Sequence, residues 1–498
     1  MAATGNSSSL SRSALIGTSW LLIQNVGTRI ISFGSQIVLA RLLAPNDFGN
    51  IGLALTVTTL ASVVANFGVD DVLLQRQKTF RFWASSAFAA SLALGLFSFL
   101  AVAAVAPLAA SMYRSQVLLS LLPIMALSMP LTALSTVPMA KFRADLNFRF
   151  LATYTTGELA ITQLLTIGLA VRGFGVYSFA IPTPVMALVK AIVFWLIARP
   201  RLGRVRLKQL RMMSSNSAVV FGTKILTAAV GQGDYFVLGL FATKSVVGAY
   251  FFAFRLAIQP VQLLAGNLSN VLFPILSQLR NEPRRQKLAA LEASRILAFV
   301  VMPYCFLQAA VARPLLNLVF GAKWQAAIPL VEILSIGLAF DAVSWVAGAL
   351  LQARGEFRRS FVYSCVFSPV FFAMVTFGAF YFSGVGVAVA VSAFYMAFAP
   401  VYSYKVFRKV GISLNEIAQI YLPPVSFATV AALVAVVCEQ WMPSGSELPR
   451  ILVIGLVGGM LYLALVHLFA PSIFHKLLAR LRESSLVRAS RPALTGET

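Results

Sequence analysis

The sequence predicts an all-α polytopic membrane protein with about 14 transmembrane helices, and three observations support this fold class. Of its 498 residues, 59% are hydrophobic and only 11% are charged, whereas soluble globular domains average about 45–50% apolar and about 25% charged residues. Apolar stretches of about 20 residues, the length that crosses a bilayer, recur along the chain. One segment also returns 195 residues later, which is typical of a transporter built from two related halves.

The predicted spans follow one another with short connections. These connections leave no room for a folded extramembrane domain. The first and seventh spans differ from the rest because polar side chains interrupt them. In chain order, the spans are residues 15–40, 49–69, 84–110, 117–139, 150–171, 176–198, 216–241, 247–275, 289–311, 326–351, 361–382, 386–404, 419–440 and 451–470.

The spans group into two related lobes. We expect an N-lobe with helices 1–6 at residues 14–198 and a C-lobe with helices 7–12 at 215–407, joined by a basic cytoplasmic linker at 199–214. Because six is an even number, both lobes enter the bilayer in the same sense, and a pseudo-two-fold axis along the membrane normal relates them. Helices 13 and 14 occupy 419–470, and 471–498 forms a cytoplasmic amphipathic helix and tail.

Basic residues set the expected orientation. Of the 40 Lys and Arg residues, 29 fall in the loops on the side of the N-terminus, 7 in the opposite loops and 4 within spans. Since cytoplasmic loops retain Lys and Arg, we expect both termini in the cytoplasm. The net charge of +24 then describes a solvated rim facing anionic lipid headgroups, so we expect no nucleic-acid partner.

The internal repeat carries a cation in each copy. Gly27–Ile30 (GTRI) returns as Gly222–Ile225 (GTKI), and similarity continues at 38–49 and 237–248. A charge in hydrocarbon costs about 2.5–3.5 kcal/mol even on the lenient insertion scale, so Arg29 and Lys224 need hydrated surroundings. This pattern favours transport of an anionic cargo.

Polar side chains share one face on each of three predicted helices. At 100° per residue, they form stripes on the first, seventh and eighth helices, which predicts a common water-filled cavity. The alternative is a structural role, in which Asp234 or Glu332 pairs with a cation or the cation reaches an interface. The stripes are Asn25, Arg29, Ser32 and Gln36; Ser217, Lys224, Gly231 and Tyr235; and Arg255, Gln259, Gln262, Gly266 and Ser269.

Catalytic patterns do not stand out in the sequence. The only histidines, His467 and His475, lie near the C-terminal end, and no carboxylate pair or metal-ligand spacing points to one site. We therefore expect no enzymatic activity, no cofactor and no metal.

Residues 39–49, LARLLAPNDFG, resemble the signature that closes the first helix of Wzx-type polysaccharide flippases. These flippases belong to the MOP superfamily, together with MATE exporters and the lipid II flippase MurJ. Further similar segments are Asn66–Gly68 before Leu73–Arg76, Phe142-Arg143 to Phe148-Arg149, and Gly248–Tyr250 leading through Pro260 to Phe273-Pro274. The resemblance covers most of the chain and implies the MOP flippase fold, with a cationic cavity between the two lobes.

The resemblance also implies a cargo. In that family, an oligosaccharide on a polyprenyl diphosphate moves from the cytoplasmic to the periplasmic leaflet of the bacterial inner membrane, by alternating access, for exopolysaccharide, capsule or O-antigen of lipopolysaccharide. Arg29, Lys224 and Arg255 are the candidates for binding the diphosphate, and polar cavity residues are the candidates for binding the sugar: Asn25, Ser32, Gln36, Gln259 and Gln262. Gate or coupling candidates are Arg41, Asp47 and Asp234. Candidate partners are the lipid-linked oligosaccharide, membrane lipids, a glycan polymerase and chain-length proteins.

Three competing functions stay open. A MATE-like ion-coupled drug exporter shares the expected fold, but its usual cationic cargo disfavours a cavity with three positive groups. A glycan polymerase or ligase normally presents a sizeable outer loop, whereas the outer loops predicted here are short. A scaffold of a glycan assembly complex is the third alternative.

Overall fold

The computed structural model describes most of the chain, and every regular element in this described part is a helix. The described residues are 27–28, 31–66, 69, 73, 79–145, 147–200, 203–206, 209, 218–442 and 447–475. Helices up to the middle of the chain are Ile31–Leu42, α2 (Pro45–Ala65), α4 (Phe80–Met112), α5 (Val117–Ala126), α6 (Ser128–Ala144), α7 (Phe148–Val171), α8 (Tyr177–Ala180), α9 (Pro182–Ala198), α11 (Ala218–Phe241), α12 (Lys244–Ala257), α13 (Gln259–Val261), the π-helix η2 (Gln262–Gly266) and α14 (Asn267–Gln278).

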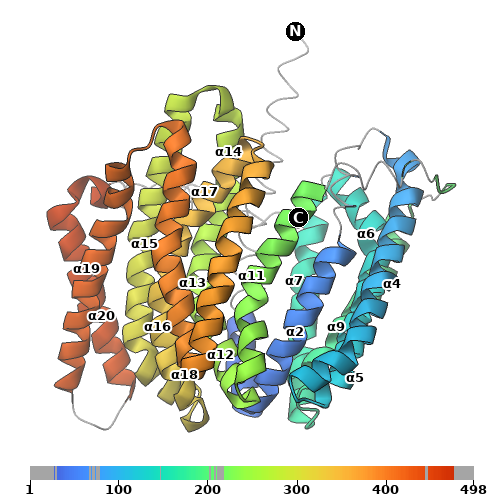
Figure 1. Ribbon diagram of the computed structural model, residues 1–498, viewed down its shortest axis with the longest axis horizontal. Helices are drawn as coiled ribbons and strands as arrows, with labels where there is room; N and C mark the ends of the chain where they lie inside the picture. The colour runs from blue at the N-terminus through green and yellow to red at the C-terminus, as the bar shows by residue number, and fades with distance from the viewer. Residues whose placement is uncertain are drawn as a thin grey trace, which may run out of the picture. The chain divides into compact units, whose positions relative to one another are not determined.

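The remaining helices complete this all-α architecture (Figure 1). They are η3 (Leu279–Asn281), α15 (Pro283–Val319), η4 (Ala322–Ala327), α16 (Ile328–Ala339), α17 (Asp341–Ala353), α18 (Phe357–Phe407), η5 (Arg408–Val410), α19 (Leu414–Gln440) and α20 (Glu447–Phe469).

The protein is a multi-pass membrane protein. Within the described residues, 10 helical stretches are long and apolar enough to cross a bilayer. One of them, Phe357–Val410, has 54 residues, more than twice the length that one crossing needs. The helices α7 and α11, 24 residues each, coincide with the fifth and seventh predicted spans but fall outside this set. The total of 14 spans therefore stays a prediction.

A sharp break divides the long helix α18. Ser383 has φ 53° and ψ −136°, outside the helical region, so two helices meet there. The break falls between the predicted spans 361–382 and 386–404. Next to it, Gly378 and Gly386 lie so close that a Cβ on either one would overlap the backbone carbonyl of the other. The absence of side chains at both positions allows this tight reversal.

The chain forms two compact units. Unit 1 combines Met1–Phe252 with Ser360–Val387, and unit 2 combines Ala253–Arg359 with Ala388–Thr498. The boundaries pass through α12 and α18, so helices of the predicted C-lobe contribute to both units. In unit 1, α11 packs on α2 and also on the first half of α18, because Gly222 and Gly233 lie against Phe361 and Phe372. The lobe boundaries themselves stay a prediction.

The two copies of the repeat meet in unit 1. A Cβ at Gly49 in α2 would overlap the carbonyl oxygen of Lys244, and a Cβ at Gly248 in α12 would overlap the carbonyl oxygen of Pro45. Gly49 and Gly248 are equivalent in the repeat, and so are Pro45 and Lys244. The contact is therefore reciprocal, which is the local signature of two-fold symmetry.

Aromatic rings surround this reciprocal contact. The ring of Phe48 lies 6.1 Å from Phe252 and 6.4 Å from Phe251, centroid to centroid. Phe48 and Phe252 are at most 2% exposed. Nearby, the Ser115 hydroxyl donates to Asn50 Oδ1 over 2.7 Å, which ties α2 to the turn between α4 and α5. Both side chains are buried, so the start of α2 is fixed by packing and by a satisfied polar contact.

Unit 2 packs around the long helix α15, which contacts α16, α17, α19 and α20. Helices α19 and α20 lie side by side (Figure 1). The Tyr462 hydroxyl of α20 donates to the Phe299 carbonyl over 2.8 Å, and Gln308 Nε2 donates to the Leu256 carbonyl over 2.9 Å. Both bonds satisfy backbone carbonyls across helices, where a lipid environment offers no water to do so.

The glycine contact between the repeats predicts a stability effect. We expect Gly49→Ala or Gly248→Ala to destabilise the protein by about 1–3 kcal/mol, because overpacking displaces backbone atoms that cannot rotate away. Thermal unfolding of the purified protein measures this. Gly157→Ala in α7 is the matched control, since open space surrounds Gly157. Equal melting temperatures for the variants and the control would contradict the prediction.

Candidate functional site

The first part of the candidate site is a polar face on α11. Lys224, Thr227 and Gly231 are exposed, and their spacing of three and four residues places them on one side of the helix. A helix of a membrane protein normally turns apolar side chains toward lipid, whereas ionisable groups face a hydrated cavity or the interior of the bundle. An exposed lysine on the same face as a threonine and a glycine is therefore typical of a helix that lines a hydrated cavity.

Farther along α11, toward its C-terminal end, the helix is buried and contains Asp234. This carboxylate is 2% exposed and accepts hydrogen bonds from the Tyr250 hydroxyl over 2.8 Å and from the Tyr235 N–H over 2.9 Å. The rings of Tyr235 and Tyr250 contact each other edge to face at 5.6 Å. Tyr235, predicted from the sequence on the polar stripe, is instead buried at 3% exposure. Asp234 thus joins α11 to α12 inside unit 1.

The described part of the first predicted helix consists of residues 27–28 and the helix Ile31–Leu42. Ser32 is half-buried, and Gln36 is buried at 9% exposure. Asn25 and Arg29 lie outside the described residues. Their predicted place on the cavity face therefore stays a prediction.

The third cation lies in unit 2, where the helix is irregular. Arg255 and Gln262 are exposed and Gln259 is half-buried. The chain changes from α12 through a turn at Ile258 to the short α13 and then to the π-helix η2. π-Helical turns inside α-helices occur frequently at functional sites. Pro260, which lacks an N–H, lies in α13 at this break and is the sequence signal for it.

The three predicted diphosphate ligands are thus not brought together by the described structure. Lys224 belongs to unit 1, Arg255 belongs to unit 2, and Arg29 is outside the described residues. The convergence of the three side chains on one cavity stays a prediction.

The flippase-like signature forms a helix start. Pro45 is the first residue of α2, where its missing N–H costs nothing. Asp47 lies in the first turn, and its Oδ2 accepts a hydrogen bond from the Ala44 N–H over 3.0 Å. This contact closes the turn from which α2 starts. Arg41 is exposed one turn earlier, and a gating role for Arg41, Asp47 or Asp234 stays a prediction.

An ion pair joins α7 and α9. Lys190 Nζ lies 3.1 Å from Glu158 Oε2, and both side chains are mostly buried. The geometry accounts for both, because a charge among apolar helices needs an opposite partner.

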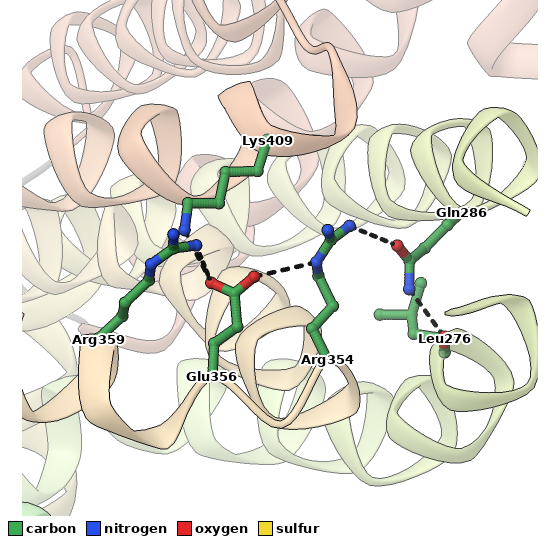
Figure 2. Close-up of polar contacts among 6 residues, drawn as sticks. All are labelled: Leu276, Gln286, Arg354, Glu356, Arg359 and Lys409. Atoms are coloured by element: carbon green, nitrogen blue, oxygen red, sulfur yellow. Dashed lines mark hydrogen bonds and ion pairs between the residues drawn. The ribbon is translucent and has the colours of Figure 1, made fainter. Parts of the chain in front are cut away.

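Sequence reasoning missed an ionic cluster in unit 2 (Figure 2). Glu356, in the turn between α17 and α18, contacts three cations: Arg354 Nε at 3.2 Å, Arg359 Nη1 at 2.5 Å and Lys409 Nζ at 2.8 Å. The exposed fraction of its side chain is only 18%. The charge pattern showed a basic loop here, but a lone acid within it carried no signal of its own.

The cluster extends into the helix ends around it (Figure 2). Arg354 Nη1 donates to Gln286 Oε1 over 3.1 Å, and Gln286 Nε2 donates to the Leu276 carbonyl over 2.9 Å. Gln286 is fully buried. One carboxylate therefore connects α14, α15, η5 and the start of α18 at one end of unit 2.

Part of the basic linker also has a fixed place. Within the described linker residues, the Gly203 N–H donates to Ser85 Oγ and the Arg206 N–H donates to Ser86 Oγ. The guanidinium of Arg206 lies 4.1 Å from the ring centroid of Phe82, a cation–π contact. These contacts dock the linker on the first two turns of α4.

Solved structures share this fold. The chain is similar to the lipid II flippase MurJ in an inward closed conformation, with a TM-score of 0.75 and 14% identity over 91% of this chain and 98% of that one. It is also similar to an inward-facing multidrug resistance MATE family transporter of the MOP superfamily, with a TM-score of 0.62 and 15% identity over 78% of this chain and 98% of that one. The fold is therefore the MOP fold, as expected from the sequence.

Sequence comparison shows the family. Residues 38–329 match the family described as Polysaccharide biosynthesis protein, and the chain belongs to this family. The succinoglycan biosynthesis transport protein ExoT of Rhizobium meliloti (strain 1021) is 29% identical over 328 residues, which are 64% of each chain. The lipopolysaccharide biosynthesis protein WzxC of Escherichia coli (strain K12) is 20% identical over 76% of this chain and 78% of that protein.

The Glu356 cluster predicts a second stability effect. We expect Glu356→Gln to destabilise the protein by about 1–3 kcal/mol, because it removes the negative charge that three neighbouring cations share and turns one acceptor oxygen into an NH₂ donor facing them. Thermal unfolding at low salt measures the change. Glu282→Gln is the control, because the Glu282–Arg285 pair is exposed and such pairs contribute little. A shift no larger than that of the control would show that the cluster does not hold unit 2 together.

Proposed function

We propose that this protein is a flippase that moves polyprenyl-diphosphate-linked oligosaccharide from the cytoplasmic to the periplasmic leaflet for surface polysaccharide biosynthesis. The observation that carries the proposal is the exposed polar face of α11 with Lys224, in a chain whose family acts in polysaccharide biosynthesis. The relatives named above as transport and biosynthesis proteins for succinoglycan and lipopolysaccharide support the same cargo class.

The chemistry of such a cargo matches the candidate residues. A diphosphate needs positive groups, which act strongly in a cavity of low dielectric constant. The groups that would bind it are Lys224, Arg255 and Arg29. The sugar hydroxyls would donate hydrogen bonds to, and accept them from, Gln36, Gln259 and Gln262. The lipid tail would stay in the bilayer. Each role follows from the side-chain type, and the convergence of these residues belongs to the proposal.

The transport cycle would be alternating access, with the two halves exposing the site first to the cytoplasm and then to the periplasm. The chain would lie in the bacterial inner membrane with both termini in the cytoplasm. It would act as a transporter and not as an enzyme, alongside a glycan polymerase and chain-length proteins. An ion gradient or the membrane potential would drive the cycle, with Asp234, closed in by Tyr250, as a coupling candidate.

Substitution of Lys224 tests the proposal. We expect Lys224→Gln to lower surface polysaccharide about tenfold or more in a host that lacks the chromosomal gene, because a hydrogen bond to a charged group contributes about 1.5–3 kcal/mol. Lys224→Arg should retain more activity, and Arg29→Ala and Arg255→Gln should behave like Lys224→Gln. The measurement compares polysaccharide at equal membrane levels of protein.

The matched control for these variants is Lys405→Gln. Lys405 is exposed in the last turn of α18 and belongs to none of the predicted polar stripes, so its loss should leave the polysaccharide level unchanged. Full complementation by Lys224→Gln and Arg29→Ala would remove both cations from the mechanism.

Ligand binding separates the proposed cargo from a cationic drug. The purified protein should bind a polyprenyl diphosphate at least tenfold more tightly than a cationic dye, because both candidate cations on described helices, Lys224 and Arg255, attract anions. Equilibrium binding in detergent measures both affinities. Tighter binding of the dye would favour a MATE-like exporter.

A further inference from the structure

A cavity of about 640 Å³ lies within unit 2, apart from all the residues assigned to the cargo. It is bounded by four helices: α15, α16, α19 and α20. The apolar part of its wall consists of Phe306, Ala309, Ala310, Ile336, Ala432, Leu433 and Val436. Leu433 is 61% exposed, so the cavity opens sideways along α19, on a surface that a bilayer would cover.

The charged part of the wall gathers at one end. Arg313 lies near the end of α15 and Glu439 near the end of α19, while Glu332 and Arg450 lie near the beginnings of α16 and α20. Two arginines and two glutamates therefore face the same end of one cavity. Trp441 follows α19 directly and is 86% exposed. Exposed tryptophans concentrate at the level of lipid headgroups, which places the charged end there.

The dimensions of the cavity match one leaflet. Along α19 the wall runs from Thr429, near the middle of the helix, to Gln440 at its last residue. At 1.5 Å per residue this distance is about 16 Å, close to half of the roughly 30 Å hydrocarbon thickness. The cavity thus has a charged mouth at one end, and its length matches the thickness of the acyl chains in one leaflet.

The charged side chains at the mouth of the cavity are only loosely paired with one another. Arg450 Nη1 lies 3.9 Å from Glu439 Oε1 and 4.0 Å from Glu447 Oε2, beyond hydrogen-bond distance. Among the described residues, nothing forms a hydrogen bond with the buried Nε of Arg450. This donor therefore remains for a ligand, and an orphan buried group of this kind is costly.

We infer that this cavity binds a glycerophospholipid whose headgroup carries both a phosphate and a primary amine. The arginines Arg313 and Arg450 bind the phosphate, the carboxylates of Glu332 and Glu439 accept hydrogen bonds from the amine, and one acyl chain lies along Leu433 and Ile336. The two acids set the choice of headgroup. A purely anionic lipid, including a polyprenyl diphosphate, would meet two like charges, and a quaternary amine has no N–H to donate.

The site is distinct from the cargo site and does not depend on the proposed function. On the predicted orientation, the ends of α15 and α19 face the periplasm, so the bound lipid belongs to the outer leaflet of the inner membrane. It fills the gap between the pair α19 and α20 and the rest of unit 2.

Lipid binding to the purified, delipidated full-length protein tests this inference. The probes are phosphatidylethanolamine, phosphatidylcholine and phosphatidylglycerol with identical acyl chains, and native mass spectrometry measures the occupancy of each. We expect one tightly bound phosphatidylethanolamine, with at least tenfold preference over the other two. Equal occupancy by phosphatidylglycerol or phosphatidylcholine would overturn the inference.

Two sets of variants locate the lipid. Leu433→Trp should fill the channel and reduce phosphatidylethanolamine occupancy at least tenfold, whereas Val430→Trp, on the same helix and also exposed but outside the cavity wall, should leave it unchanged. Equal occupancy in both variants would place the lipid elsewhere.

The second set changes the headgroup preference without blocking the cavity. Glu332→Gln combined with Glu439→Gln should shift the preference from phosphatidylethanolamine toward phosphatidylglycerol, because the lining then carries a net positive charge. An unchanged preference would show that these carboxylates do not recognise the amine. Because the readout is lipid occupancy and not transport, this result is independent of whether the protein moves an oligosaccharide.

Discussion

Helices in a bilayer gain little by hiding apolar surface from one another, because the lipid tails are equally apolar, so their association depends on close packing. In this protein, glycines permit that packing at several crossings. Gly49 and Gly248 bring the two repeats together, Gly378 and Gly386 close the reversal inside α18, and Gly337 lies against Ser392 between α16 and α18. At these positions the neighbour is a backbone atom or the base of a short side chain, which cannot move aside. The arrangement of the helices that carry the candidate site therefore depends on residues that have no side chain.

Charges in the described structure fall into two groups with different surroundings. Lys190 with Glu158, and Glu356 with its three cations, have partners at short distances and connect helices. The side chains of Lys224 and Arg255 are exposed. Because a charge facing hydrocarbon is unfavourable, a hydrated cavity explains the second group better than lipid contact does. Lys190, Glu158 and Glu356 thus hold helices together, and a role of Lys224 and Arg255 in binding an anionic cargo stays a proposal.

The fold could be predicted from the sequence because its signals are long and repeated. The hydropathy pattern gave the all-helical membrane class, and it placed a break between residues 382 and 386, where Ser383 interrupts α18. The site was harder to predict. The helical period correctly placed Lys224 and Gly231 on an exposed face but wrongly added Tyr235, since one angle per residue ignores that Tyr250 and Phe251 of α12 pack against this end of the helix. The Glu356 cluster and the cavity near Arg450 are formed by residues that are far apart in the chain. No local sequence pattern predicts such tertiary contacts.

The mutual contact of Gly49 and Gly248 bears on how a chain of this kind tolerates change. Gly49 contacts the backbone of Lys244, and Gly248 contacts the backbone of Pro45, the residue equivalent to Lys244 in the first repeat. This is the isologous geometry of a homodimer interface, here formed within a single polypeptide. In a true homodimer, every mutation changes both copies of a contact. In this single chain, a mutation changes only one of the two equivalent contacts. The two repeats are therefore free to diverge in sequence, one carrying Pro45 where the other carries Lys244, while the shared backbone crossing keeps them in register.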